Sequence, residues 1–230
     1  MLKYIKKIFV FYRYRLPSIG IDDIADPLFS PMEFITEHIN IPSPPRPQFN
    51  HDDLTPLLRI ALVMKPDNIL ELGTAYGNTT ANLCAACNAH IYTINALPEQ
   101  MSGHFITISL KKDEIGKVYR MHGFENRVTQ IYENTKIFDH TRYFDTPCID
   151  LAIIDACHDT EFVMSDFKKV LPLLKEKAVV LFHDTHPSRQ KHLAGSYIAC
   201  VKLRKEGYDI RHIENTWWGI WRKGFDREHL

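Results

Sequence analysis

Two short stretches of this sequence carry the side chains best suited to acid–base or metal chemistry. Asp155 and His158 follow one apolar run, and His183 and Asp184 follow another. An imidazole titrates near physiological pH and suits a general base, whereas carboxylates are preferred ligands of divalent cations. We therefore expect His158 and Asp155 to be catalytic, and Asp155, His183 and Asp184 to be candidate metal ligands. The alternatives are a surface-loop histidine at 158 and a helix-capping aspartate at 184.

A glycine turn follows an earlier apolar run. Gly73 and Gly77 stand four residues apart in Ile69-Leu-Glu-Leu-Gly-Thr-Ala-Tyr-Gly-Asn-Thr-Thr80, and the residues after Gly77 have the composition of a helix. This pattern predicts a strand, a tight turn with positive φ at the glycines, and a helix start. Missing Cβ atoms would let a ligand approach the turn. We expect the N–H groups of the helix's first turn to face that ligand, with a polar residue of 78–80 as cap.

The remaining chain alternates strand and helix signals. Several candidate strands are apolar throughout, as strands buried on both faces should be. They span Ile69–Leu72, His90–Asn95, Arg127–Tyr132, Ile149–Asp155 and Ala178–Asp184. The clearest helix is Glu161–Leu174, whose apolar residues share one face. This alternation predicts a mainly parallel sheet with right-handed crossovers.

The last two strand candidates break this alternation. Tyr208–Ile213 and Thr216–Arg222 are separated by only two residues. A parallel crossover needs a dozen or more residues, so this pair should form an antiparallel hairpin.

Composition limits the classes of function. Lys plus Arg equals Asp plus Glu at 28 each, so no net charge attracts nucleic acid, and we expect none as a partner. Five cysteines, an odd number without turn-rich spacing, predict reduced thiols and a cytoplasmic protein. The 230 residues suffice for one α/β domain with an extension. We expect residues 1–50 to be an N-terminal extension with a Pro-rich linker at 40–47, and residues 51–230 to be the domain.

Two segments outside the predicted core can contact other molecules. Residues 1–15 alternate basic and apolar side chains at helical spacing, without a signal peptide or a transmembrane run. Such a helix docks on its own domain, lies on an anionic membrane surface, or packs on a second copy in a homo-oligomer. Residues 96–108 form a long connection that is a candidate lid or acceptor-binding loop.

The glycine turn decides between two nucleotide-binding classes. It lacks the middle glycine of G-x-G-x-x-G, which weakens a dinucleotide-binding interpretation. Glu-x-Gly-x-x-x-Gly-x-Thr with a terminal hairpin instead resembles the class I S-adenosylmethionine-dependent methyltransferases. From Leu57 to Lys223 the chain is similar to a bacterial subgroup whose fourth strand ends in Asp-Gly-x-His and whose fifth ends in His-Asp. The matching residues here are Asp155-Ala-Cys-His158 and His183-Asp184.

This resemblance implies a Rossmann-like fold, a doubly wound, mainly parallel seven-stranded sheet with a C-terminal antiparallel hairpin. Strands one and four flank the point where strand order reverses, so the glycine turn and the two acid–histidine stretches should converge there. The implied cofactor is S-adenosylmethionine. The cofactor-binding positions that the resemblance implies are Glu71, Gly73, Thr74, Ala75, Tyr76 and Gly77 around the methionine part, Asn95 at the ribose and Asn134 at the adenine.

The resemblance also implies an activity. We expect a methyltransferase that methylates a small-molecule hydroxyl, such as that of a sugar or secondary metabolite. Some relatives use Mg²⁺ at the positions of Asp155, His183 and Asp184. An alternative is a catalytically silent domain of the same fold that serves as a binding or assembly partner, because Asn95 and Asn134 stand where aspartate is usual. A nicotinamide-dependent oxidoreductase is a third hypothesis, which the glycine turn favours least.

Overall fold

The computed structural model describes residues 16–25, 51–101, 109–186 and 194–224. The predicted helix at 1–15 and the Pro-rich linker at 40–47 lie outside the described residues. The candidate lid at 96–108 is described only as far as residue 101. All five cysteines are described and free of disulfides, as the composition predicted.

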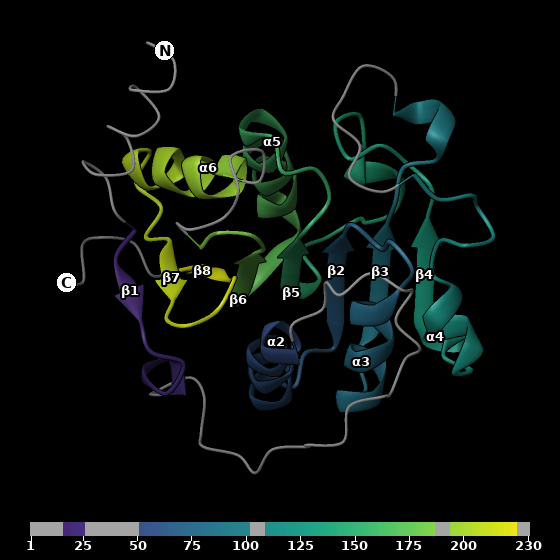
Figure 1. Cartoon of the computed structure of the whole chain (residues 1–230), viewed down its shortest axis with the longest axis horizontal. Helices are drawn as coiled ribbons and strands as arrows, with labels where there is room; N and C mark the ends of the chain where they lie inside the picture. Colours follow the sequence, from purple (N-terminus) through teal and green to yellow (C-terminus); the bar gives the residue numbers. More distant parts are fainter. Residues whose placement is uncertain (1–15, 26–50, 102–108, 187–193, 225–230) are drawn as a thin grey trace.

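One mixed sheet organises the domain (Figure 1), with the strand order β1-β7-β8-β6-β5-β2-β3-β4. Its strands are β1 (Ser18–Ile19), β2 (Asn68–Leu72), β3 (His90–Ile94), β4 (Val128–Ile131), β5 (Ile149–Ile154), β6 (Leu174–Phe182), β7 (Arg211–Ile213) and β8 (Gly219–Arg222). Among these described strands, only β8 runs antiparallel to its neighbours. The predicted parallel sheet with a terminal hairpin is confirmed.

An eighth strand joins the seven that the resemblance implied. β1 pairs in parallel with β7 at the sheet edge, through Ser18 with His212 and Ile19 with Ile213. Leu16 and Ile24, on either side of β1, are buried in the two main apolar clusters. Part of the expected N-terminal extension therefore packs with the domain, although the domain boundary itself stays a prediction.

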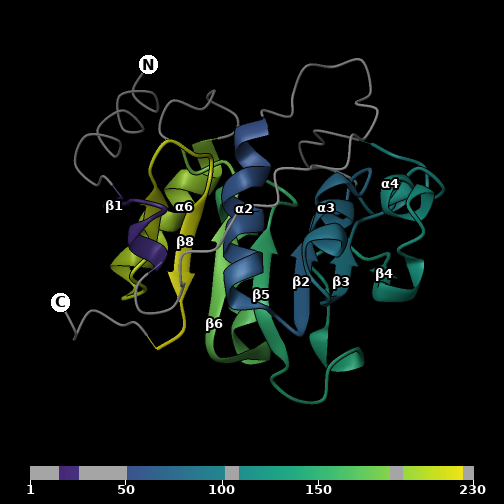
Figure 2. The ribbon, with the colours of Figure 1, turned by 90° about the horizontal axis from the view of Figure 1, so that it is seen from below.

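Helices cover both faces of the sheet (Figures 1 and 2). Helices α5 (Thr160–Val170) and α6 (Ala194–Lys205) lie on one face, and α2 (His51–Met64) and α3 (Asn78–Ala86) lie on the other. Successive strand residues point to opposite faces, so Leu70 and Leu72 pack with α5 and α6, whereas Ile69 packs with α2 and α3. Shorter elements are α4 (Lys117–Met121) and the 3-10 turns Asp23–Ala25, Pro98–Gln100, Glu125–Arg127, His140–Arg142 and Leu171–Leu173.

The predicted helix Glu161–Leu174 is too long at its C-terminal end. Helix α5 stops at Val170, residues Leu171–Leu173 form a 3-10 turn, and Leu174 already begins β6. Pro172 explains the difference, because proline has no backbone N–H for the α-helical bond.

The strand order reverses between β2 and β5. From β2 the chain builds outward through β3 and β4, and it then returns to place β5 on the other side of β2. Connections at the carboxyl ends of these two strands leave in opposite directions, which opens the crevice where α/β sheets bind ligands. No helix in the described ranges is long and apolar enough to cross a membrane.

Candidate active site

The glycine turn has the predicted backbone conformation, with φ of 108° at Gly73 and 83° at Gly77. A Cβ on Gly73 would lie 2.2 Å from the carbonyl oxygen of Asp155, so the close approach of the segment after β5 requires glycine at this position. Contact of Gly73 with a ligand stays a prediction. Gly77 is itself the N-cap of α3, and no side chain caps the helix. The expected cap among residues 78–80 is therefore wrong.

Neighbouring loops hold the turn in place. The N–H of Ala75, which has a φ of 47°, donates to Asn95 Oδ1 at 3.0 Å, and the carbonyl of Ala75 accepts from Gly116 N at 2.9 Å. A Cβ on Gly77 would lie 2.9 Å from Gly116 Cα. The segment before α4 thus packs directly against the turn, a contact that the sequence did not indicate.

Glu71 and Thr74 face the protein interior. Glu71 is 1% exposed, and its Oε2 accepts from the hydroxyls of Thr80 and Thr93 at 2.5 Å each. Thr74 Oγ1 lies 2.7 Å from Thr93 Oγ1. Burial raises the pKa of Glu71 to about 7, although the two threonine hydrogen bonds oppose this shift. Both side chains therefore hold the turn from the interior of the domain, and their contact with a cofactor stays a prediction.

The two asparagines implied as cofactor contacts already make hydrogen bonds within the chain. Asn95 Oδ1 accepts from the turn at Ala75, and its Nδ2 donates to the carbonyl of Ala96. Asn134 Oδ1 accepts from Lys136 N, and its Nδ2 donates to the carbonyl of Gln100. Tyr76 packs on Ala81, Val118 and Tyr119. These contacts position the turn and the loops after β3 and β4, while cofactor binding by these residues stays a prediction.

Four ionisable side chains meet where β5 and β6 end. His183 Nδ1 lies 2.9 Å from Asp155 Oδ1, and His158 Nε2 lies 2.7 Å from Asp184 Oδ2. Two longer contacts connect these pairs: 3.5 Å from His158 Nε2 to Asp155 Oδ1, and 3.6 Å from His183 Nδ1 to Asp184 Oδ1. We call these four residues the Asp–His cluster. It joins both acid–histidine stretches of the sequence, and Asp155 places it beside the glycine turn.

Each charged group in the Asp–His cluster shifts the pKa values of the other groups. Burial raises the pKa of Asp155, but the His183 and His158 contacts outweigh it and hold that pKa well below its usual range. The pKa of Asp184 is lowered in the same way, chiefly by His158. Burial lowers the pKa of His158, yet its contacts with both carboxylates raise it to about 9. His158 is therefore mainly an imidazolium at neutral pH when no ligand is bound.

Backbone packing fixes the loop that carries His158. Gly195, at the start of α6, lies so close to this loop that a Cβ on it would be 2.0 Å from the carbonyl oxygen of His158. The carbonyl oxygen of Gly195 accepts a hydrogen bond from Thr160 Oγ1 at 3.2 Å. The ring of Trp218 lies 4.6 Å from that of His183, between centroids. Asp184 has a φ of 58°, a left-handed conformation that aspartate tolerates better than most residues. No pattern in the sequence indicates that Gly195 and Trp218 belong to the site, because only the folded chain brings them there.

Comparison with known proteins identifies the family. A family model described as a methyltransferase domain matches residues 70–185, from β2 to just beyond β6, which is half of the chain. The chain belongs to the methyltransferase domain family. The matched residues of this methyltransferase include the glycine turn and the whole Asp–His cluster, and its fold is that of the class I S-adenosylmethionine-dependent enzymes. None of the curated proteins compared with the chain matches it in sequence.

Solved structures share the fold of this methyltransferase at low sequence identity. A putative caffeoyl-CoA O-methyltransferase from Staphylococcus aureus is 19% identical, with a TM-score of 0.57 over 74% of this chain and 82% of the other. The O-methyltransferase TomG from Streptomyces achromogenes, solved with S-adenosylmethionine, is 16% identical, with a TM-score of 0.51 over 73% and 77%. CalS11, a TDP-rhamnose 3'-O-methyltransferase of calicheamicin biosynthesis, is 16% identical, with a TM-score of 0.54 over 74% and 77%.

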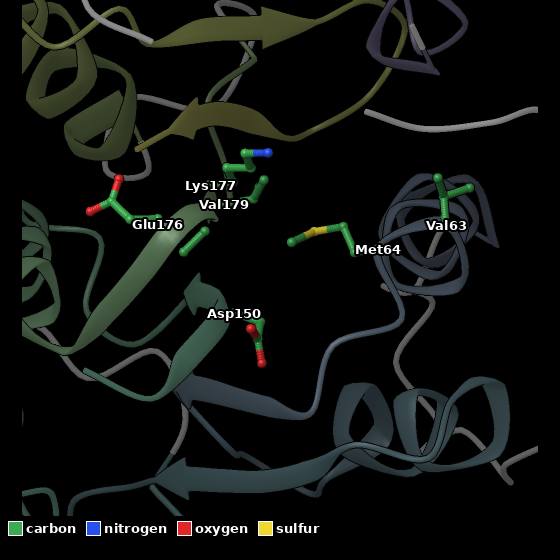
Figure 3. A pocket seen from close by; sticks show the side chains of 7 residues that line it. Val63, Met64, Asp150, Glu176, Lys177 and Val179 are labelled. Carbon is green, nitrogen blue, oxygen red and sulfur yellow. The ribbon is translucent and has the colours of Figure 1, made fainter. Parts of the chain in front are cut away.

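A shallow hollow of about 200 Å³ lies elsewhere on this methyltransferase. Val63 and Met64 from the end of α2 line it, together with Asp150 of β5 and residues 176–179 of β6 (Figure 3). It lies toward the amino ends of those strands, whereas the Asp–His cluster follows their carboxyl ends. Asp150 accepts from the backbone of residues 67 and 68 and pairs with Lys175. The carboxylate of Asp150 in this hollow is thus used for structure.

The donor atoms of the Asp–His cluster do not suit Mg²⁺. That ion demands near-octahedral oxygen coordination and retains several waters. Here the imidazole nitrogens of His158 and His183 stand among the carboxylate oxygens. The expected Mg²⁺ ligands Asp155, His183 and Asp184 do lie together, but this methyltransferase does not offer Mg²⁺ the ligands that it prefers.

Proposed function

We propose that this methyltransferase transfers the methyl group of S-adenosylmethionine to a hydroxyl of a small molecule, such as a sugar or secondary metabolite. The observation that carries the proposal is the Asp–His cluster, whose Asp155 backbone touches the turn at Gly73. A proton acceptor is thereby held next to the expected cofactor cradle. O-Methylation needs such a group, because a hydroxyl must lose its proton as its oxygen forms the new bond.

Three features of the chain support binding of the cofactor. The turn has positive φ at Gly73, Ala75 and Gly77, a backbone conformation typical of loops whose N–H groups bind an anion. Helix α3 begins there without a side-chain cap, which leaves N–H groups for a carboxylate. Asn78 Oδ1 is buried and has no hydrogen-bond partner among the described residues, so it suits an ammonium donor. S-Adenosylmethionine has both a carboxylate and an ammonium group.

The residues of the cluster then take distinct roles. His158 accepts the hydroxyl proton at Nε2, and the charge of Asp184, whose Oδ2 lies 2.7 Å from that nitrogen, stabilises the imidazolium that forms. Asp155 contacts the same nitrogen at 3.5 Å and adds a second negative charge. When bound, S-adenosylmethionine supplies an electrophilic methyl group on a positively charged sulfur. A positive charge near His158 favours its neutral form and so counteracts the raised pKa.

Calorimetric titration with S-adenosylmethionine and with NAD tests the cofactor. We expect binding of the former alone. A transfer assay with methyl-labelled S-adenosylmethionine and a panel of sugar and phenolic hydroxyl acceptors then tests the reaction. His158→Ala should lower the turnover about 10² to 10⁴-fold with little change in cofactor affinity, as loss of a general base does. The exposed His122, changed to Gln, is the matched control and should leave both values unchanged.

The same experiments separate the enzyme from a silent binding domain. The hydrogen bonds that Asn95 and Asn134 make within the chain favour this second candidate, because they occupy groups expected at the ribose and adenine. Absence of S-adenosylmethionine binding, or an unchanged turnover in His158→Ala, would contradict the catalytic proposal.

A further inference from the structure

We propose that Asp155, His158 and His183 bind a divalent cation of the Zn²⁺ and Co²⁺ class rather than Mg²⁺, and that this ion competes with the acceptor proton for His158. The first half concerns metal binding alone. The second half rests on the proposed function, because it makes the ion an inhibitor of the base.

The geometry places three donor atoms around one point. Asp155 Oδ1 lies 2.9 Å from His183 Nδ1 and 3.5 Å from His158 Nε2. Each of the three residues can offer one ligand atom such that these atoms lie within 4.8 Å of one another. Two ligand atoms that each sit about 2.0 to 2.1 Å from a cation are themselves about 2.9 to 3.5 Å apart in octahedral or tetrahedral coordination. The two contacts of Asp155 Oδ1 match that separation.

The chemistry of these donors selects the class of ion. Imidazole nitrogen is a ligand that Zn²⁺, Co²⁺ and related ions prefer, whereas Mg²⁺ prefers oxygen. Two histidines and one carboxylate provide three protein ligands and leave a further position open, as in catalytic zinc sites. Because His183 supplies a second nitrogen ligand at the end of β6, the three ligands together favour Zn²⁺ or Co²⁺ over Mg²⁺.

The surroundings favour a cation over a simple ion-pair network. Both ring nitrogens of His158 are buried, and neither makes a hydrogen bond of good geometry among the described residues, although Nε2 lies 2.7 Å from Asp184 Oδ2. The close approach of the ring to two carboxylates is thus not aligned as hydrogen bonding requires. Asp184 supplies a second negative charge beside the three ligands, and Trp218 packs on His183, which restricts the ligand ring.

Occupation of this site would change the role of His158. The nitrogen that we assign as proton acceptor, Nε2, is the nitrogen that faces Asp155 and the shared space. Its lone pair can bind a proton or a metal ion but not both. Saturating Zn²⁺ should therefore slow methyl transfer, and a chelator should restore it.

Metal binding is tested on the full chain after treatment with chelator and dialysis. Co²⁺ is titrated while its visible absorption reports the coordination, and calorimetry compares Co²⁺, Zn²⁺ and Mg²⁺ without S-adenosylmethionine. We expect Co²⁺ and Zn²⁺ to bind at least about 100-fold more tightly than Mg²⁺. His183→Asn should weaken Co²⁺ binding about 10 to 100-fold, and His183→Asp should shift the preference towards Mg²⁺. His122→Gln is the control and should bind Co²⁺ like the parent.

Each outcome decides one half of the proposal. Equal or tighter binding of Mg²⁺, or Co²⁺ binding that His158→Gln and His183→Asn leave unchanged, would overturn the metal site whether or not the chain is an enzyme. Methyl transfer that saturating Zn²⁺ leaves unchanged or accelerates would overturn the competition for His158. Tight Co²⁺ binding in a chain that never transfers a methyl group would instead support the site and refute the proposed function.

Discussion

Replacement of the buried Glu71 by Gln should make the protein more stable at alkaline pH. Burial raises the pKa of Glu71 from 4.5 to about 7 in the folded chain. The folded state therefore holds this proton more tightly than the unfolded state. Glu71 contributes most to stability below pH 4.5, and that contribution is lost as the pH rises through 7. The shift corresponds to about 3 kcal/mol over this range.

Glutamine resembles the protonated acid at every pH. Its carbonyl oxygen can accept from Thr80 and Thr93 as Oε2 does, and its amide group replaces Oε1, which has no hydrogen-bond partner among the described residues. We expect Glu71→Gln and the parent to have similar free energies of unfolding near pH 5, and the variant to gain up to about 3 kcal/mol by pH 8. The burial of Glu71, 1% exposed, makes solvent screening a small correction.

Urea denaturation at half-unit pH steps measures this difference. The buried Asp166, whose pKa burial also raises to about 7, titrates equally in both proteins and cancels. Glu176→Gln, at a side chain that is 83% exposed, is the control for removal of a carboxylate at the surface. A difference between Glu71→Gln and the parent that stays constant from pH 5 to pH 8 would refute the assignment of a raised pKa to Glu71.

Two further substitutions test how the site is positioned. Gly195→Ala should lower turnover at least about tenfold and destabilise the fold by about 1 to 3 kcal/mol, because the new Cβ collides with the His158 carbonyl. Steady-state kinetics and thermal unfolding measure the two effects, and a variant with the turnover and stability of the parent would contradict this prediction. Gly123→Ala, where a Cβ meets nothing within 4 Å but φ is 74°, is its control; it should lose some stability to the left-handed backbone and retain turnover. Asn95→Asp should tighten S-adenosylmethionine binding about tenfold in calorimetry, since a carboxylate accepts ribose hydroxyls more strongly and still accepts from Ala75; unchanged or weaker binding argues against a ribose contact.

The arrangement of the sheet could be predicted because it depends on patterns along the chain. Apolar runs alternating with helices require parallel strands, and the two residues between the last strand candidates leave room only for a hairpin. The Glu-x-Gly-x-x-x-Gly turn and the two acid–histidine stretches also reveal their positions in sequence, since each follows an apolar run. Their convergence follows once strand order is known. The resemblance to class I methyltransferases implied that order.

Contacts between distant segments could not be predicted in the same way. Strand β1 consists of only Ser18 and Ile19, which no periodic pattern distinguishes from a loop. The sequence indicated neither that Thr74 points inward to Thr93 nor that Gly116 packs on the turn, because these contacts depend on how two loops fit together. The contact between Gly73 and the backbone of Asp155 also depends on how two loops fit together, so the sequence did not indicate it.

The two close glycine contacts show how the chain fixes its chemistry. Gly73 packs on the carbonyl of Asp155 and Gly195 on the carbonyl of His158, so backbone contacts hold both ends of the segment 155–158. One contact comes from the turn after β2 and the other from the start of α6, so the expected cofactor cradle and the expected base share a single rigid connection. A methyl transfer depends on in-line placement of its reacting atoms to within fractions of an ångström. A chain with every Asp and His of the cluster, but a larger residue at either glycine, should therefore keep the ionisable groups and lose their alignment.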